Sequence, residues 1–265
     1  MGKKIAVVTG ASSGMGREFV RQLDASEEFE EIWAIARRHD RLEELQDGLR
    51  ARLRPLALDL TEAGAGEAYA SLLEAERPRV AVLVNAAGFG VFGAFTERDL
   101  ENQLNMIELN DKALVRMTAL TLPHMDRGSR IYQMGSLSSF QPVPYIGIYG
   151  ASKAFVLSYS RSLNVELRPR GIRVMAVCPG WVRTEFFDRA VSDDTVCYYD
   201  RWYTPEQVVT RALRDMGRGR DVSVCGLPVR AQVLLVKLLP HRLVMGIWCR
   251  QQKQPRETKK SEKNS

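Results

Sequence analysis

Two residues with acid–base chemistry, Tyr149 and Lys153, stand four positions apart. No Gly or Pro interrupts the chain from Ala151 to Arg168, so the sequence predicts a long helix that begins near the tyrosine. A spacing of four puts both side chains on one helical face. A free phenol has a pKa near ~10, and a neighbouring ammonium favours the phenolate. The pair therefore indicates a tyrosine that exchanges protons with a substrate, unless both are ordinary residues of an amphipathic helix.

A glycine-rich turn, TGASSGMG from Thr9 to Gly16, lies between a predicted strand at Ile5–Val8 and a helix that opens at Arg17. Its glycines let the backbone approach a pyrophosphate, which the N-terminus of the following helix stabilises. The spacing is G-x-x-x-G-x-G. This turn predicts a dinucleotide site.

The same stretch also satisfies G-x-S-x-G, the nucleophile elbow of the α/β-hydrolases. A hydrolase needs an acid and then a histidine downstream. His39 lies in a charged segment, and the other two histidines, His124 and His241, adjoin prolines. A serine hydrolase is therefore the weaker interpretation of this stretch.

A second strand is predicted at Glu31–Ala36 and ends in Arg37 and Arg38. At this position of a dinucleotide fold an acid accepts the 2′-hydroxyl of NAD, whereas arginine suits the 2′-phosphate of NADP. No acid stands there, because Asp40 comes later. We therefore expect NADP ahead of NAD; the alternative is a pair of surface arginines that open a helix over His39–Arg52.

Strands and helices alternate along the rest of the chain. Further strands are predicted at Leu56–Leu60, Val80–Val84, Ile131–Met134 and Arg173–Val177, and further helices at Glu62–Arg77 and Arg98–Met125. This alternation predicts an α/β fold, a single Rossmann-type doubly wound parallel sheet with helices on both faces. The polar motifs follow the strands, at the carboxyl edge where such sheets bind ligands.

The ordered set of motifs closely resembles the short-chain dehydrogenase/reductase family. The motifs are Thr9–Gly16, Asn85–Gly88, Ser136, Tyr149 with Lys153, and Pro179–Gly180, within about residues 5–185. The resemblance implies one domain that binds NAD or NADP and reduces a carbonyl to an alcohol, or the reverse, by hydride transfer. The aromatic residues between Trp181 and Tyr203 suggest an apolar small molecule as substrate.

The resemblance also implies a role for each residue. Tyr149 would give its proton to the carbonyl oxygen, and Lys153 would lower the pKa of the phenol and bind the nicotinamide ribose. Ser136 would hold the carbonyl, and Asn110 would anchor a water in a proton relay. The implied cofactor contacts are Gly10, Ser12, Ser13, Gly14, Met15, Gly16, Arg37, Arg38, Asp59, Leu60, Asn85, Ala86, Ala87, Gly88, Tyr149, Lys153, Pro179, Gly180, Val182 and Thr184.

Two residues depart from the family pattern. Many NADP-using members carry Arg or Lys where this chain has Ser13, so contact with the phosphate would fall on Arg37 and Arg38. Ala86 stands where the family usually has a second Asn. Another alternative is a non-catalytic regulator of the same fold, but such a protein would be expected to lose Tyr149, Lys153 or Ser136.

Composition narrows the remaining functions. Of the net charge of +6, the segment from Arg250 to Ser265 supplies +4, which is a basic tail and not a nucleic-acid stripe. The four cysteines form no CxxC and have no histidine pair nearby, so we expect no metal site and a reducing compartment. No signal-peptide core or membrane span is present, which favours a cytoplasmic enzyme. The family's habit is a homodimer or homotetramer.

The C-terminal part contains two short apolar helices from about residue 227, broken at Pro240. We expect residues 1–249 to form the domain and residues 250–265 to form a disordered basic tail. Three interpretations of the helices remain: a pair that caps the core, a lid over an apolar substrate, or a surface that lies on an anionic membrane. We rank plain packing first, the lid second and membrane contact third.

Overall fold

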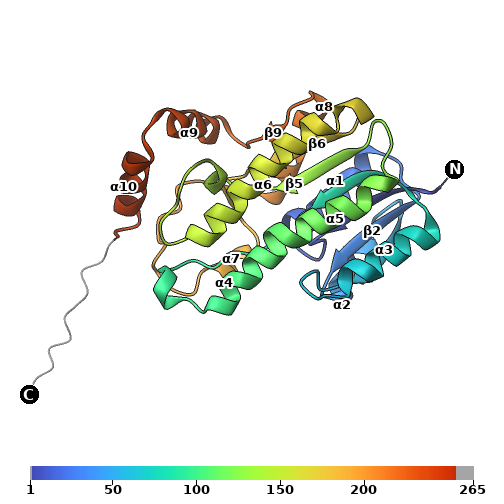
Figure 1. Cartoon of the computed structure of the whole chain (residues 1–265), viewed down its shortest axis with the longest axis horizontal. Helices are drawn as coiled ribbons and strands as arrows, with labels where there is room; N and C mark the ends of the chain where they lie inside the picture. The colour runs from blue at the N-terminus through green and yellow to red at the C-terminus, as the bar shows by residue number, and fades with distance from the viewer. Residues whose placement is uncertain (1, 255–265) are drawn as a thin grey trace, which may run out of the picture.

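The computed structural model describes residues 2–254 and contains one seven-stranded sheet (Figure 1). All six neighbouring strand pairs are parallel, in the order β3-β2-β1-β4-β5-β6-β9. The strands are β1 (Lys4–Thr9), β2 (Glu31–Ala36), β3 (Arg52–Ala57), β4 (Arg79–Asn85), β5 (Arg130–Met134), β6 (Arg173–Val177) and β9 (Val222–Ser223). The predicted doubly wound parallel fold is confirmed.

Helices cover both faces of the sheet, and α5 and α6 cross in front of it in Figure 1. One core contains Ala6 and Val8 of β1 with apolar residues of α1 (Gly14–Ser26) and α8 (Pro205–Gly217). The other contains Ile5 and Val7 with residues of α3 (Ala65–Glu76), α5 (Leu114–Thr121) and α6 (Gly147–Glu166). Successive side chains of a strand point to opposite faces, so an unbroken apolar strand supplies both cores.

The region before β3 differs from the sequence-based expectation. Only α2 (His39–Glu43) and a 3₁₀ turn (Glu44–Gln46) are helical, and the strand begins at Arg52, four residues before the predicted Leu56. Because β3 is an edge strand of the sheet, it tolerates Pro55, which has no N–H to donate. The arginines of β3 resemble the polar end of a helix, which is why the sequence predicted helix there.

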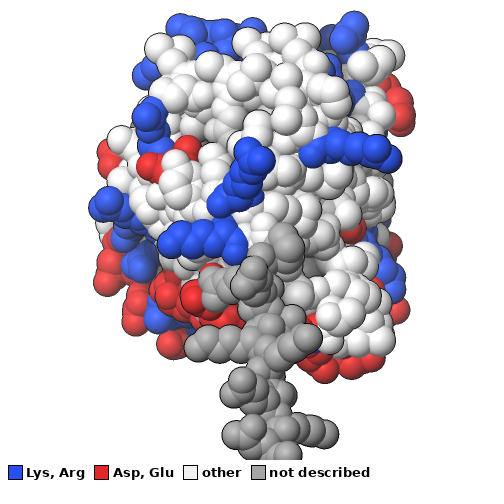
Figure 2. Space-filling model, turned by 90° about the vertical axis from the view of Figure 1, so that its left-hand side faces the viewer, with Lys and Arg blue, Asp and Glu red and all other residues white. Residues whose placement is uncertain are grey.

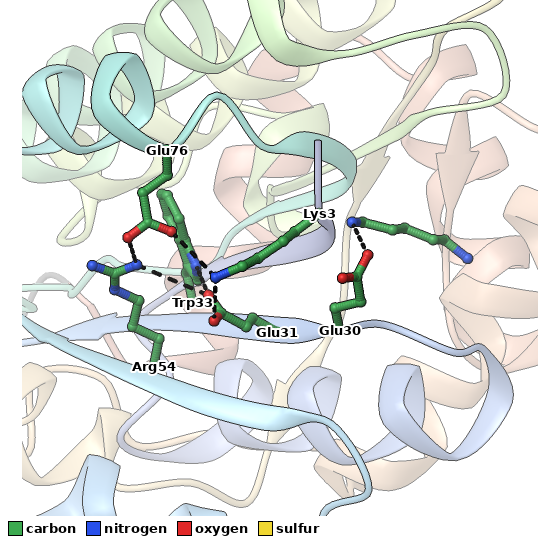
Figure 3. A network of polar contacts seen from close by, with 7 residues as sticks. Lys3, Glu30, Glu31, Trp33, Arg54 and Glu76 are labelled. Carbon is green, nitrogen blue, oxygen red and sulfur yellow. Dashed lines mark hydrogen bonds and ion pairs between the residues drawn. The ribbon is translucent and has the colours of Figure 1, made fainter. Parts of the chain in front are cut away.

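A polar network closes the amino end of the sheet (Figure 3). Glu31 accepts hydrogen bonds from Lys3 Nζ at 2.9 Å and from Trp33 Nε1 at 3.0 Å. Burial alone would raise the pKa of Glu31, but these hydrogen bonds outweigh it and the pKa is lowered. Arg54 lies 5.1 Å from the centre of the Trp33 ring and pairs with Glu76. The network links Lys3, the residue before β1, with β2, β3 and α3 at the end of the sheet opposite the glycine-rich turn.

The helix expected from Arg98 to Met125 has four parts. They are α4 (Leu100–Ile107), a π-helical segment (Glu108–Ala113), α5 and a 3₁₀ turn (Leu122–His124). The wider π turn carries Asn110, which is fully buried. Such turns are frequent at functional sites.

The C-terminal helices are α9 (Leu227–Leu238) and α10 (His241–Gln251), which lie at the left in Figure 1. The expected domain end at residue 249 falls inside α10, and Gln252 beyond it is fully buried. The part of the expected tail at residues 255–265 lies outside the described residues. No helix within residues 2–254 is long and apolar enough to span a membrane.

Candidate active site

A cavity of about 880 Å³ opens at the carboxyl edge of the sheet. Every predicted cofactor contact except Asn85 lines it, and so do the catalytic candidates Ser136, Tyr149 and Lys153. Asn110 does not line it. The cavity runs from the glycine-rich turn, past the ends of β4, β5 and β6, to a wall formed by α9 and α10.

The glycine-rich turn is held against the end of β4. Gly10 has a φ of +68°, and a Cβ there would lie 2.7 Å from the backbone nitrogen of Ala87. The Thr9 hydroxyl accepts hydrogen bonds from the N–H groups of Ala86 and Ala87, both at 3.1 Å. Position 10 therefore requires glycine, for its conformation and for its close contact with the next strand.

The N-terminus of α1 begins in this turn and has the features of an anion site. The side chain of its N-cap residue, Ser13, makes no capping hydrogen bond, and the first turn of α1 contains no acidic residue. The first backbone N–H groups and the positive end of the helix dipole therefore meet no competing carboxylate of that turn. A pyrophosphate fits this end of the cavity.

Arginines and two acids surround the end of β2. Arg37 lies 3.7 Å from Asp59 Oδ2. Arg38 donates to Glu185 Oε2 at 2.9 Å and to Ser12 Oγ at 3.3 Å, and Arg41 also pairs with Glu185. The positive charge that the sequence predicted at Arg37 and Arg38 is therefore partly compensated.

Arg189 adds a further cation to this region. It belongs to α7 (Phe186–Ala190), and its guanidinium lies 3.4 Å from the centre of the Phe89 ring. Burial and the charge of Arg37 lower the pKa of Arg189, against the charge of Asp59. Sequence reasoning missed Arg189 and Glu185, because nothing in the local pattern of residues 181–203 shows that this segment reaches the end of β2.

The catalytic candidates converge where α6 begins. The Tyr149 ring packs against Phe92 and Phe186, with centroid distances of 5.8 and 5.5 Å, and the Ser136 side chain lies beside its phenol. Lys153 Nζ lies 5.7 Å from the Tyr149 ring centre and donates to the backbone oxygen of Met134 at 2.9 Å. Three residues that are 17 positions apart at most thus share one wall of the cavity.

Burial controls the protonation of this group. It raises the pKa of Tyr149 to about 12, although the Ser136 hydrogen bond acts in the opposite direction. It lowers the pKa of Lys153 to about 8, although the charge of Asp111 opposes this change. Burial outweighs the other effects on the phenol in this structure, and the lowering of its pKa by Lys153 stays a prediction. Tyr149 is a protonated acid at neutral pH.

Asn110 lies behind the cavity wall with its amide fully bonded. Its Oδ1 accepts from the Phe89 N–H at 3.0 Å, and its Nδ2 donates to the Phe89 oxygen at 3.0 Å and to Ser152 Oγ at 3.1 Å. Ser152 Oγ in turn donates to the Tyr149 backbone oxygen at 2.8 Å. Asn110 therefore joins the loop after β4 to the start of α6; its role in a proton relay stays a prediction.

Asn85 points into the protein interior. Its Nδ2 donates to Thr118 Oγ1 at 3.0 Å and to Gln133 Oε1 at 2.8 Å. The side chain thus binds β4 to α5 and β5, while the next three residues line the cavity. The expected contact of Asn85 with the cofactor is not provided by its side chain in this arrangement.

The far half of the cavity is aromatic and apolar. Its aromatic lining includes Phe92, Trp181, Phe186, Phe187 and Trp248. Trp248 of α10 stacks on Trp181 at 6.5 Å and donates to the backbone oxygen of Pro144 at 2.9 Å. Leu235 and Val236 of α9 and Ile247 of α10 complete this wall. An apolar molecule fits this half.

Gln252, just after α10, ties the C-terminal helices to the loop before β8 (Trp202–Tyr203). Its Oε1 accepts from the N–H groups of Cys197 at 2.8 Å and Tyr198 at 2.9 Å. A single buried glutamine thus holds the loop that shares the cavity wall with α10. No sequence signal identified this residue.

A hydrolase site is not assembled around the glycine-rich turn. Ser12 is 7% exposed, and its hydroxyl is hydrogen bonded to Arg38. No histidine is among the described residues that line the cavity. A serine nucleophile there would have no imidazole base.

Comparisons with known proteins place the chain among oxidoreductases. Residues 4–195 match the family described as short chain dehydrogenase. Sulfoacetaldehyde reductase 2 of Chromohalobacter salexigens is 35% identical over 205 residues, covering 71% of this chain and 79% of that protein. The NADP-dependent 3-hydroxy acid dehydrogenase YdfG of Salmonella typhi is 34% identical over 186 residues, covering 69% and 74%.

A solved structure with a similar fold is the short-chain dehydrogenase from Sphingobium yanoikuyae in complex with NADPH. It is 30% identical, with a TM-score of 0.76 over 98% of this chain and 100% of that chain. The similarity therefore includes the part of the chain beyond residue 195, where α9 and α10 lie.

Proposed function

The chain belongs to the short chain dehydrogenase family, and from this premise we propose that it is an NADP(H)-dependent enzyme that reduces a carbonyl group of an apolar small molecule, or oxidises the corresponding alcohol. The observation that carries the proposal is the convergence of Ser136, Tyr149 and Lys153 on one cavity wall. On one side of this wall is an anion-binding turn, and on the other an aromatic pocket.

A dinucleotide fits the polar half of the cavity. The open N-terminus of α1 would hold the pyrophosphate, and Lys153 would bind the nicotinamide ribose. The nicotinamide supplies the hydride that the carbonyl carbon receives.

The chain's own residues supply position and protons. The Ser136 hydroxyl, beside the phenol, holds the carbonyl oxygen of the substrate in hydrogen-bonding distance of Tyr149. Tyr149 then donates its proton to that oxygen as negative charge develops there; in the reverse direction it accepts the proton of the alcohol. The Lys153 ammonium stabilises the phenolate that proton donation leaves behind. Phe92 and Phe186 exclude water from the phenol.

Arginines support NADP over NAD. Arg37 and Arg38 line the cavity at the end of β2, and Arg189 reaches the same region from α7. A guanidinium forms charge-assisted, bidentate hydrogen bonds with a phosphate. Two similar proteins support a preference for NADP: the Sphingobium yanoikuyae dehydrogenase is in complex with NADPH, and YdfG is described as NADP-dependent.

We further propose a homodimer or homotetramer in the cytoplasm. Leu100 and Leu104 of α4 and Phe155 and Val165 of α6 are exposed, which is a surface suited to a second copy of the chain. The four free cysteines suit a reducing compartment. The alternative is a non-catalytic dinucleotide-binding regulator of the same fold.

The test is reduction of ketones and aldehydes, followed as consumption of NADPH, by the unmodified protein and by Tyr149→Phe. The variant should lose at least about 100-fold in kcat, because proton transfer by a positioned acid contributes roughly 10²–10⁴-fold. Its affinity for NADPH should change little. Tyr159→Phe on the same helix is the matched control, since Tyr159 does not line the cavity. Retention of most activity by Tyr149→Phe would contradict the mechanism, and inactivity of the unmodified protein on all carbonyls would favour the regulator.

A further inference from the structure

Helix α9 is apolar on two opposite sides. Val229, Val233 and Val236 are buried on the side that faces the protein. Leu234 and Leu238, on the opposite side, are 64% and 82% exposed. Positions 227, 234 and 238 lie within a narrow arc of an α-helix, so Leu227, which is 78% exposed, extends the same stripe. The outer stripe has no partner among the described residues, so packing of the core does not explain it.

Helix α10 continues this apolar surface. Leu243 and Ile247 are exposed and one turn apart. Together with the outer leucines of α9 (Leu227, Leu234, Leu235 and Leu238) they form what we call the C-terminal apolar surface. Single exposed apolar residues are ordinary on soluble proteins, but a group of six on two consecutive helices marks an interaction site.

The charge of the chain is concentrated in the same segment. Residues 227–265 contain nine Lys or Arg and two Glu, a net charge of +7, so residues 1–226 carry a net charge of −1. No acidic residue occurs between Leu227 and Gln254. Figure 2, which looks at the end of the molecule that carries α9 and α10, shows uncharged surface with separate Lys and Arg side chains, whereas acidic side chains gather in its lower part.

We propose that the C-terminal apolar surface binds an anionic lipid membrane, with α9 and α10 lying in the plane of its interface. Leucines that enter the acyl boundary, flanked by cations such as Lys237 and Arg242 that meet the headgroups, are the pattern of interfacial helices. With 12 and 11 residues, the two helices are too short to span the bilayer. A second copy of the chain is a poorer occupant, because two such surfaces placed face to face would bring like charges together.

The C-terminal apolar surface adjoins the cavity, so membrane contact would place the cavity next to the lipid. Leu235 and Ile247 are exposed on the surface and also line the cavity. An apolar substrate dissolved in the membrane would therefore enter the aromatic pocket without crossing water. This consequence, unlike the membrane contact itself, rests on the proposed function.

The experiment is co-sedimentation of the full chain with vesicles of phosphatidylcholine alone or mixed with phosphatidylglycerol. The unmodified protein should bind the mixed vesicles more tightly, and added salt should weaken the binding. Leu234→Gln/Leu238→Gln should bind the mixed vesicles about tenfold or more weakly, since two apolar side chains no longer enter the interface. Neither leucine lines the cavity, so NADPH consumption with a water-soluble carbonyl should be unchanged in this variant.

Phe95→Gln, which alters an exposed aromatic side chain of the 3₁₀ turn at Phe95–Glu97, is the matched control and should keep full vesicle binding. Equal binding by the α9 double variant and the unmodified protein would overturn the proposal, as would no binding by either. If the α9 variant instead reduces the oligomeric state and no protein binds vesicles, the surface belongs to a second copy. Vesicle binding by a protein that reduces no carbonyl would overturn the proposed function and leave the membrane surface in place.

Discussion

Lys153→Met should abolish activity and stabilise the folded protein. Lys153 is 5% exposed, and its amino group donates one hydrogen bond, to the backbone oxygen of Met134. Methionine has a similar length and no charge, so it fills the same volume without the cost of holding an ammonium away from water.

The structure gives the magnitude. Burial lowers the pKa of Lys153 from 10.5 to about 8. One pKa unit corresponds to about 1.36 kcal/mol, so the buried ammonium costs the fold about 3 kcal/mol at neutral pH. Loss of the hydrogen bond to Met134 removes about 1 kcal/mol. Lys153→Met should therefore raise the free energy of unfolding by about 2 kcal/mol at pH 7, from the difference between these two effects.

The sign of this effect changes with pH. Between about pH 8 and 10.5 the unfolded lysine keeps its proton while the folded one has lost it, so the unfolded state binds more protons and stability rises with pH. The unmodified protein should therefore gain stability through this window relative to the variant. Near pH 10 the two effects should cancel, so that the advantage of Lys153→Met disappears, and above pH 10.5 only the cost of the lost hydrogen bond should remain.

Urea unfolding of both proteins without cofactor, at several values between pH 7 and pH 10, measures this difference. Lys112→Met, at an exposed position of the π-helical segment, is the control and should show no such pH-dependent difference. Parallel stability curves for the unmodified protein and Lys153→Met across this range would refute the argument that Lys153 is held desolvated.

The remaining predictions concern the cofactor and the C-terminus. Arg37→Ala should weaken NADPH binding about 10- to 100-fold with little effect on NADH binding, because a charge-assisted hydrogen bond contributes roughly 1.5–3 kcal/mol. Titration of both cofactors into this variant, with Arg52→Ala as the control, measures the two affinities. Equal losses of NADPH and NADH affinity would contradict the assignment of Arg37 to the 2′-phosphate. Gln252→Ala should lower the free energy of unfolding by about 1–3 kcal/mol, because the N–H groups of Cys197 and Tyr198 lose their acceptor. Urea unfolding should show the same loss of stability when the chain is truncated after Arg250, whereas truncation after Gln254 should leave the free energy of unfolding unchanged. Equal stability of the two truncated chains would mean that the Gln252 hydrogen bonds do not stabilise the fold.

Much of the fold was predictable because its signals are local. Continuous apolar strands, a turn with glycines at fixed spacing, and a Tyr–Lys pair one helical turn apart are each specified by neighbouring residues. Ordered along the chain, they also predicted which strand ends meet at the cavity. The early start of β3 was missed because alternating arginines on an edge strand resemble a polar helix end.

The rest of the site depends on contacts between distant parts of the chain. Glu185 pairs with arginines about 145 positions earlier, and Gln252 binds a loop about 55 positions earlier, so no window of sequence contains either partnership. The direction of the Asn85 and Asn110 amides, away from the cavity and into the interior, was equally hidden. The sequence shows that an amide is present, but packing decides whether it faces the cavity or the interior.

The aromatic wall of the cavity has an optical consequence. Of the four tryptophans, Trp33 lies in the core, whereas Trp181 and Trp248 line the cavity and Trp202 packs against Phe187 beside them. Tryptophan emission overlaps the absorption band of reduced nicotinamide. Most of the protein's intrinsic fluorescence should therefore be quenched by energy transfer when reduced cofactor binds. The chain contains its own reporter of cofactor occupancy, with no dye attached.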